Sequence, residues 1–117
     1  MAHTSPALPL AGLRVLDFSR VVSGPFASQL LVDLGAEVIR VQALPADAAA
    51  ADTGPGPLTE AEAFTWGLSR NKHSVCVDLK NSRGRELVER LVAVSDIVFD
   101  NFRPGVMDRL GLDRETL

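Results

Sequence analysis

Cysteine is almost missing from this 117-residue sequence, which has one, Cys76, and no tyrosine. A lone cysteine excludes a disulfide within the chain and fits a reducing cytosol, so we expect a cytoplasmic protein. Cys76 falls in a short apolar run, where it is predicted to be a small buried hydrophobic residue. Long apolar runs are missing as well. No stretch reaches the ~20 residues of a membrane span, and residues 1–10 lack the apolar run of a signal peptide.

A strong charge of either sign is also missing, because the net charge is −3. Such a balance attracts neither nucleic acid nor an anionic membrane, and we expect neither as a partner. His3 and His73 have no second ligand at metal spacing, so no metal site is expected. The remaining composition, 46% hydrophobic and 23% charged, is typical of a soluble globular domain.

The first half of the sequence predicts a strand–helix–strand unit. Residues 13–18 read as a strand, and Ser23 or Gly24 then caps a helix that ends at Gly35. A second strand follows at 38–41, which is the arrangement of a parallel sheet with a right-handed crossover. Apolar residues at helical spacing are expected to form the buried face of the helix, namely Phe26, Leu30, Leu31 and Leu34.

Residues 43–58 interrupt this regularity. They are rich in Ala, Pro, Gly and Asp and show no sustained period, which predicts a flexible surface loop. The segment 59–62, Thr-Glu-Ala-Glu, matches a capping box, so a helix is expected to begin there. Phe64 and Trp66 are predicted to belong to the core-facing side of that helix.

The second half repeats the alternation of strand and helix. A strand is predicted at 74–79, a helix opens at Ser82, and another strand follows at 96–99. The helix carries one apolar stripe, made of Leu87, Val88, Leu91 and Val92. A short helix over 104–111 and a capping residue at Asp113 complete the pattern. Together these elements predict an α/β fold, a Rossmann-like parallel sheet with flanking helices that forms a truncated part of a larger domain.

Ligands of open parallel sheets bind outside the carboxyl ends of the strands. Three such ends occur here, at 18–25, 79–83 and 100–105. The first contains a single glycine, Gly24, so the GxGxxG pattern is missing, and the second strand ends at Gln42 instead of an acidic residue. Both departures argue against an NAD-binding enzyme.

Three blocks of the sequence resemble family III CoA-transferases, and they occur in that family's order. They are 10–18 with Gly24-Pro25 and 33–41, then 71–80 (Asn-Lys-His-Ser through Asp-Leu-Lys), and finally 100–105 (Asp-Asn-Phe-Arg-Pro-Gly) with 109–112. The resemblance leaves out only the first residues and 43–58. It identifies residues 1–117 as the amino-terminal part of the large domain of such an enzyme.

The resemblance implies exchange of coenzyme A between an acyl-CoA and a carboxylic acid, in an interlocked homodimer of the full-length protein. The family's nucleophilic aspartate belongs beyond Leu117, so we expect no catalytic residue here and no activity of this chain alone. The positions that match family contacts to CoA are Val21, Val77, Lys80, Asn101, Phe102, Arg109 and Leu110. Lys80 and Arg109 would neutralise phosphates, and Phe102 would face the adenine ring.

Departures from the family pattern leave alternatives open. Ala43 stands where the family often has an arginine, and Val22 replaces a glutamine on the substrate side. A 2-methylacyl-CoA racemase is the nearest alternative, but its third block commonly has Gly-Tyr where this sequence has Asn101-Phe102, which favours a transferase. A non-catalytic CoA- or nucleotide-binding module is the second alternative, and a truncated product that folds poorly is the third.

The candidate residues also have plain structural interpretations. Lys80 and Arg109 fit solvated surface charges, and Phe102 fits a core residue. Asn101 fits a turn in which it bonds its own backbone. Asp17, at the end of a strand, is expected to bond neighbouring amides.

Overall fold

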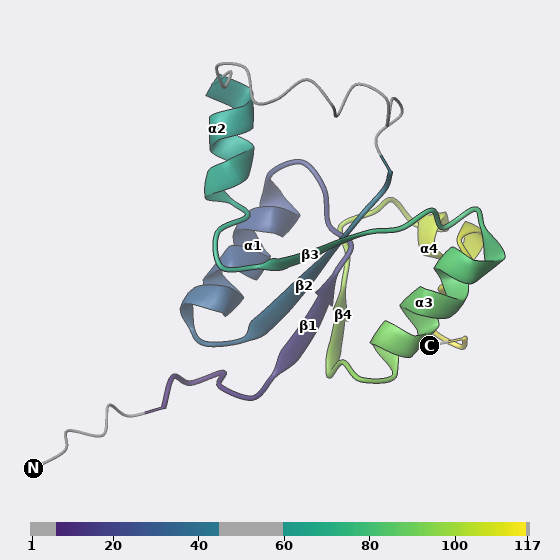
Figure 1. Ribbon diagram of the computed structural model, residues 1–117, viewed down its shortest axis with the longest axis horizontal. Coiled ribbons are helices and arrows are strands. Elements are labelled where there is room, and N and C mark those ends of the chain that lie inside the picture. Colours follow the sequence, from purple (N-terminus) through teal and green to yellow (C-terminus); the bar gives the residue numbers. More distant parts are fainter. Residues whose placement is uncertain (1–6, 45–59, 117) are drawn as a thin grey trace, which may run out of the picture.

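The structure is a computed structural model that describes residues 7–44 and 60–116. The described residues form a four-stranded sheet and four helices (Figure 1). In chain order the elements are β1 (Arg14–Asp17), α1 (Ser23–Asp33), β2 (Glu37–Gln42), α2 (Glu60–Gly67), β3 (His73–Cys76), α3 (Ser82–Val92), β4 (Ile97–Phe99) and α4 (Val106–Arg109). Apart from residues 43 and 44, the expected loop at 43–58 lies outside the described residues, as do Thr59 and the side chain of Glu62 in the expected capping box.

The sheet has the order β3-β2-β1-β4, and every neighbouring pair is parallel. At its centre Val15 lies opposite Val38 on one side and Ile97 on the other. The chain therefore adds β2 and β3 in one direction and then returns to the other side of β1 for β4. Such a reversal of strand order leaves a crevice at the carboxyl ends of the two strands, and ligands of open α/β sheets bind there. The expected α/β sheet is confirmed.

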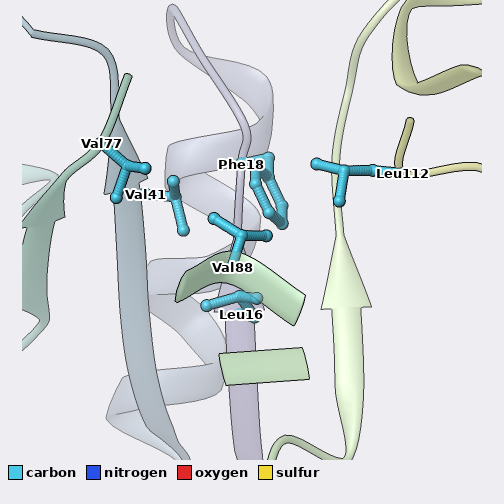
Figure 2. Close-up of a cluster of buried hydrophobic side chains, with 6 residues drawn as sticks. All are labelled: Leu16, Phe18, Val41, Val77, Val88 and Leu112. Atoms are coloured by element: carbon cyan, nitrogen blue, oxygen red, sulfur yellow. The ribbon is translucent and has the colours of Figure 1, made fainter. Parts of the chain in front are cut away.

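One face of the sheet is covered by α3 and the region of α4. Because side chains alternate along a strand, Leu16 and Phe18 point to this face. They form a buried cluster, called the α3 cluster below, whose other members are Val41, Val77, Val88 and Leu112 (Figure 2). Figure 2 shows Val88 of α3 inserted between Leu16 and Phe18. Full burial of a side chain of this size contributes about 1.5–3 kcal/mol.

The opposite face packs against α1 and combines apolar and polar groups. Val15 and Val38 form a second buried cluster with Ala36, against Leu31 and Val32. Asp17 alternates to this same face and is completely buried. Its carboxylate accepts hydrogen bonds from the Ser19 amide (2.8 Å) and the Ser28 hydroxyl. The expected bonding of Asp17 to a neighbouring amide is confirmed.

Lys72 completes this buried network from the connection between α2 and β3. Its ammonium donates to Ser28 Oγ (2.7 Å) and to the Pro25 carbonyl (2.8 Å), and it lies 3.8 Å from the Asp17 carboxylate. Its side chain is 1% exposed. Burial lowers the pKa of Lys72, and the nearby Asp17 carboxylate opposes that shift. The network fastens Pro25 and Ser28 of α1 to the end of β1 and to the residue that precedes β3.

The expected apolar face of α1 is confirmed only at Leu31, which is half-buried against Val15 and Val38, and is wrong at its other three residues. Phe26, Leu30 and Leu34 are each about half exposed, and the buried residues of the helix are instead Gly24, Pro25, Ser28 and Gln29. The side of the helix with these residues faces the sheet, because the Ser28 hydroxyl donates a hydrogen bond to the buried Asp17 carboxylate. The helix also begins after Val22, with no side-chain cap at Ser23 or Gly24. Gly35, in the left-handed region with φ 101°, follows the helix as expected.

Three further burial predictions need correction. Phe64 and Trp66 of α2 are exposed, and Leu68, just after the helix, is the buried residue there. Cys76 is exposed, because Val75 and Val77 take the positions that face the α3 cluster and Cys76 lies between them in the alternation. In α3 the stripe is confirmed at Val88, with Leu91 and Val92 half-buried, but Leu87 is exposed.

Candidate functional site

Two loops meet at the carboxyl ends of β1 and β4, and the side chain of Asn101 joins them. Its Oδ1 accepts a hydrogen bond from the Arg20 amide (2.8 Å), and its Nδ2 donates to the Arg20 carbonyl (2.9 Å). One amide side chain thus pairs both backbone groups of Arg20, as a neighbouring strand would. Asn101 does not bond its own backbone; Asp100 makes that turn by accepting from the Phe102 amide (2.9 Å).

The loop that begins α1 is tightly packed and strained. A Cβ on Gly24 would lie 2.3 Å from Ser19 Cβ and 2.9 Å from Asn101 Cγ, so only glycine fits. Val21 has φ 66°, a left-handed conformation that is costly for a β-branched residue, and it is 85% exposed. Strained residues of this kind persist where surrounding bonds hold them, and they concentrate at functional sites.

Arg20 lies over Phe102, with 5.6 Å between the guanidinium carbon and the centroid of the ring. This is the geometry of a cation–π contact. The ring is half-buried and packs against the α3 cluster. The core role considered for Phe102 is therefore present, and the ring also supports a cation at the end of β1.

Three of the predicted cofactor contacts line one cavity of about 380 Å³. Val77 and Lys80 come from the end of β3, and Leu110 follows α4. The other lining residues are Arg20, Ala43, Leu44, Asp78 and Leu79. The cavity thus combines apolar walls with two cations and one carboxylate, the mixture that suits a ligand with a ring and a phosphate.

A second cavity of about 290 Å³ adjoins the first, since Arg20 and Ala43 line both. Val21, the fourth predicted contact, belongs to this second cavity with Ser19, Arg40, Val41 and Gln42. Asn101 and Phe102 line neither cavity, but both contact Arg20. Arg109, at the end of α4, lines neither cavity.

Lys80 is placed by the turn between β3 and α3. Its amide donates to Asp78 Oδ1 (3.0 Å), and α3 begins just beyond, capped by Asn81, whose side chain accepts from the Arg83 amide (2.9 Å). Within the described residues the Lys80 ammonium has no hydrogen bond or ion pair, so its charge is available to a ligand. Sequence reasoning identified Lys80 but missed Arg20 and Lys72, although a basic residue directly after the first strand was a usable signal for Arg20.

A larger cavity, of about 440 Å³, lies beneath α2 and is lined by Arg40, Arg70 and Lys72 among others. Its cations already have partners. Arg40 donates to Ser69 Oγ (2.7 Å), Arg70 to Asp33 Oδ2 (2.7 Å), and Lys72 belongs to the buried network. The carboxylates of Asp33 and Asp17 compensate Arg70 and Lys72, whereas Ser69 leaves the charge of Arg40 uncompensated, and Arg40 lines the second cavity as well.

Residues 7–44 and 60–116 contain no group of three His, Cys, Asp or Glu side chains that could hold a metal ion. They also contain no helix long and apolar enough to cross a membrane.

Rv3272 of Mycobacterium tuberculosis, a probable fatty acyl-CoA transferase, is 45% identical over 119 aligned residues, which cover all of this chain and 30% of that protein. Succinyl-CoA:glutarate CoA-transferase of Mus musculus is 38% identical over 109 residues, covering 93% of this chain and 25% of the mouse protein. A crystal structure of Rv3272 matches with a TM-score of 0.78 at 44% identity, covering 96% of this chain and 30% of that one.

This chain therefore spans less than a third of the length of these relatives. The family model named CoA-transferase family III matches residues 10–117, which include every element of the described fold. The identities, the fold and the family match agree: the chain belongs to CoA-transferase family III.

Proposed function

We propose that this chain is the amino-terminal portion of an acyl-CoA:carboxylate CoA-transferase and supplies part of its CoA-binding site. Membership of the family supports the reaction class. One relative named above is a succinyl-CoA:glutarate CoA-transferase, a name that specifies an acyl-CoA and a carboxylic acid, and transferase names favour this reaction over the racemase alternative. The observation that carries the proposal is the cavity where Val77, Lys80 and Leu110 meet.

The chemistry of coenzyme A fits this cavity. The cofactor carries phosphates, an adenine ring and a thiol arm, so its site needs cations beside apolar walls. Lys80 offers a charge without a partner among the described residues, and Val77 and Leu110 offer apolar contacts. Asn101 and Phe102 act through Arg20, and Val21 contributes from the adjoining cavity. Arg109 lines neither cavity, so its proposed phosphate contact rests on the family resemblance alone.

The role of this chain in the reaction is to bind the cofactor. Transfer breaks the thioester of the acyl donor and forms a new thioester with the acceptor acid, and the family resemblance assigns the nucleophilic aspartate to a part of the protein outside this sequence. We expect this chain alone to be inactive. We expect the full-length protein to be cytoplasmic and to act as an interlocked homodimer without a metal.

Titration calorimetry of CoA into the 117-residue chain tests the proposal. We expect micromolar binding, weakened about ten-fold by Lys80→Ala, because losing a charged hydrogen-bond partner costs about 1–3 kcal/mol. The matched control is Arg90→Ala, which removes a cation from the last turn of α3, at the end of that helix away from Lys80. A folded chain that binds no CoA, or equal losses in both variants, would contradict the proposal.

A further inference from the structure

We propose that Arg20 is the phosphate-binding residue at the centre of this cofactor site, where its guanidinium bonds a phosphate of CoA at the junction of the two cavities. This inference rests on the proposed function and adds a specific residue to it. Arg20 and Ala43 are the residues that line both cavities, so a ligand that spans them passes between these two side chains.

The charge of Arg20 is available. Among residues 7–44 and 60–116, its guanidinium makes no hydrogen bond and no ion pair, whereas Arg40 and Arg70 donate to Ser69 and Asp33. A surface arginine without a partner is common, but this one lines a cavity. The first cavity also holds Lys80 and the carboxylate of Asp78, which accepts from the Lys80 amide. Two cations face one carboxylate, and this leaves a positive charge for an anion.

The position of Arg20 is fixed before any ligand arrives. Its backbone is held on both sides by Asn101, and its guanidinium lies over the Phe102 ring. Contacts that hold a side chain in its bound position reduce the entropy that binding must remove. A planar guanidinium supported on one face keeps its N–H edge free to form paired bonds to phosphate. This explains why Asn101 and Phe102 matter to the site without lining either cavity.

Ala43 contributes no charge to the junction that it shares with Arg20. It is exposed and lines both cavities with a single methyl group, so the end of β2 supplies no charge to the ligand at this point. Arg20 enters the same space from the end of β1. An arginine placed at position 43 would reach the same junction from the neighbouring strand, and it therefore provides a rescue experiment.

The experiment measures the Kd of CoA for five substituted forms of the 117-residue chain and for the unsubstituted one. Arg20→Gln keeps a planar group but removes the charge, and Arg20→Lys keeps the charge but removes the planar group. Arg20→Ala is studied alone and combined with Ala43→Arg. Arg90→Ala is the control for loss of a distant cation, and the melting temperature of each form shows that it is folded.

We expect Arg20→Gln and Arg20→Ala to weaken CoA binding at least about ten-fold and Arg20→Lys to weaken it less. Adding Ala43→Arg should restore most of the affinity that Arg20→Ala loses, which a merely structural role of Arg20 would not allow. Unchanged affinity in Arg20→Gln would overturn the inference while leaving the proposed function intact. Equal losses in the Gln and Lys variants, with no recovery from Ala43→Arg, would also overturn it. Failure of the unsubstituted chain to bind CoA would instead refute the proposed function, and this inference with it.

Discussion

At the scale of single residues, Lys72 is the least expected feature of the molecule. Its ammonium is enclosed between Asp17, Ser28 and the Pro25 carbonyl, with almost no exposure to solvent. Desolvation of a charge is costly, and a buried pair persists only where additional hydrogen bonds satisfy both partners. Here Ser28 and Ser19 supply those bonds to Asp17. The pair therefore fixes the position of α1 on the sheet.

Replacing Lys72 with methionine is expected to lower the free energy of unfolding by about 3 kcal/mol, because the Asp17 carboxylate stays buried without its counter-charge. Urea unfolding followed by circular dichroism measures this change. The matched control is Lys80→Met, an exposed lysine that should change stability by less than about 0.5 kcal/mol. Similar stability of the two variants would show that the buried pair contributes nothing.

Comparing the unsubstituted chain with Lys72→Met also gives a test of pH dependence with a definite sign. Burial lowers the pKa of Lys72 below its ordinary value of 10.5 in the folded chain. Between the two values the unfolded chain binds more protons, so unfolding becomes less favourable as the pH rises. The stability of the unsubstituted chain relative to Lys72→Met should therefore increase as the pH rises through the folded pKa towards 10.5. A flat or falling difference would contradict the assignment, and the lack of tyrosine keeps this range free of phenol titration.

At the scale of elements, the junction of β3 and α3 depends on one glycine. A Cβ on Gly84 would lie 2.1 Å from the carbonyl oxygen of Asp78, which is backbone and cannot move aside alone. The first turn of α3 thus lies directly on the turn that carries Lys80. The position of α3 and the proposed cofactor site are therefore coupled at this contact.

Gly84→Ala is expected to destabilise the chain by about 1–3 kcal/mol, the usual cost of overpacking, and to weaken CoA binding by displacing Lys80. Thermal unfolding and calorimetry measure the two effects. Gly67→Ala is the control, because a Cβ at the end of α2 would meet no atom within 4 Å. If Gly84→Ala is as well tolerated as Gly67→Ala, the tight contact is not structurally important.

The order and type of the elements could be predicted from the sequence, because strand and helix periods and turn residues such as Gly35 are local signals. The buried faces of the helices could not be predicted as reliably. Phe26 and Leu30 form an apolar stripe, yet α1 turns Ser28 to the sheet because a buried Asp17 needs a hydrogen-bond donor. The candidate site could be predicted only in part, because some of its residues are placed by local signals and others by contacts between distant parts of the sequence. The position of Lys80 follows from its strand end, whereas the place of Arg20 depends on Asn101, 81 residues away.

At the scale of the whole molecule, the surface retains large apolar side chains. Val21, Phe26, Leu30, Phe64 and Trp66 are all at least about half exposed. They lie on α1, on α2 and in the loop before α1, on the side of the sheet away from the α3 cluster. The core of the described residues is therefore uneven, because its larger cluster lies between the sheet and α3 and only its smaller one lies on the side of α1.

This asymmetry predicts opposite outcomes for two apolar substitutions. Phe26→Ser should change the free energy of unfolding by less than about 1 kcal/mol, because the ring is already half exposed. Leu16→Ala should cost about 2–5 kcal/mol, because it opens a cavity in the cluster drawn in Figure 2. Urea unfolding of both variants distinguishes the two sites. A large loss in Phe26→Ser would mean that α1 buries this ring.

The strand order β3-β2-β1-β4 also has a consequence for the chain while it is being made. Translation proceeds from the amino terminus, so β1 and β2 leave the ribosome together, whereas β4 and Asn101 follow much later. At about 5–20 residues per second, the interval between Gln42 and Phe99 lasts roughly 3–11 s. Lys72 emerges within that interval, so the buried network can close around Asp17 before β4 exists. The hold on Arg20 cannot form until Asn101 has been made, so the proposed cofactor site is completed after the buried network.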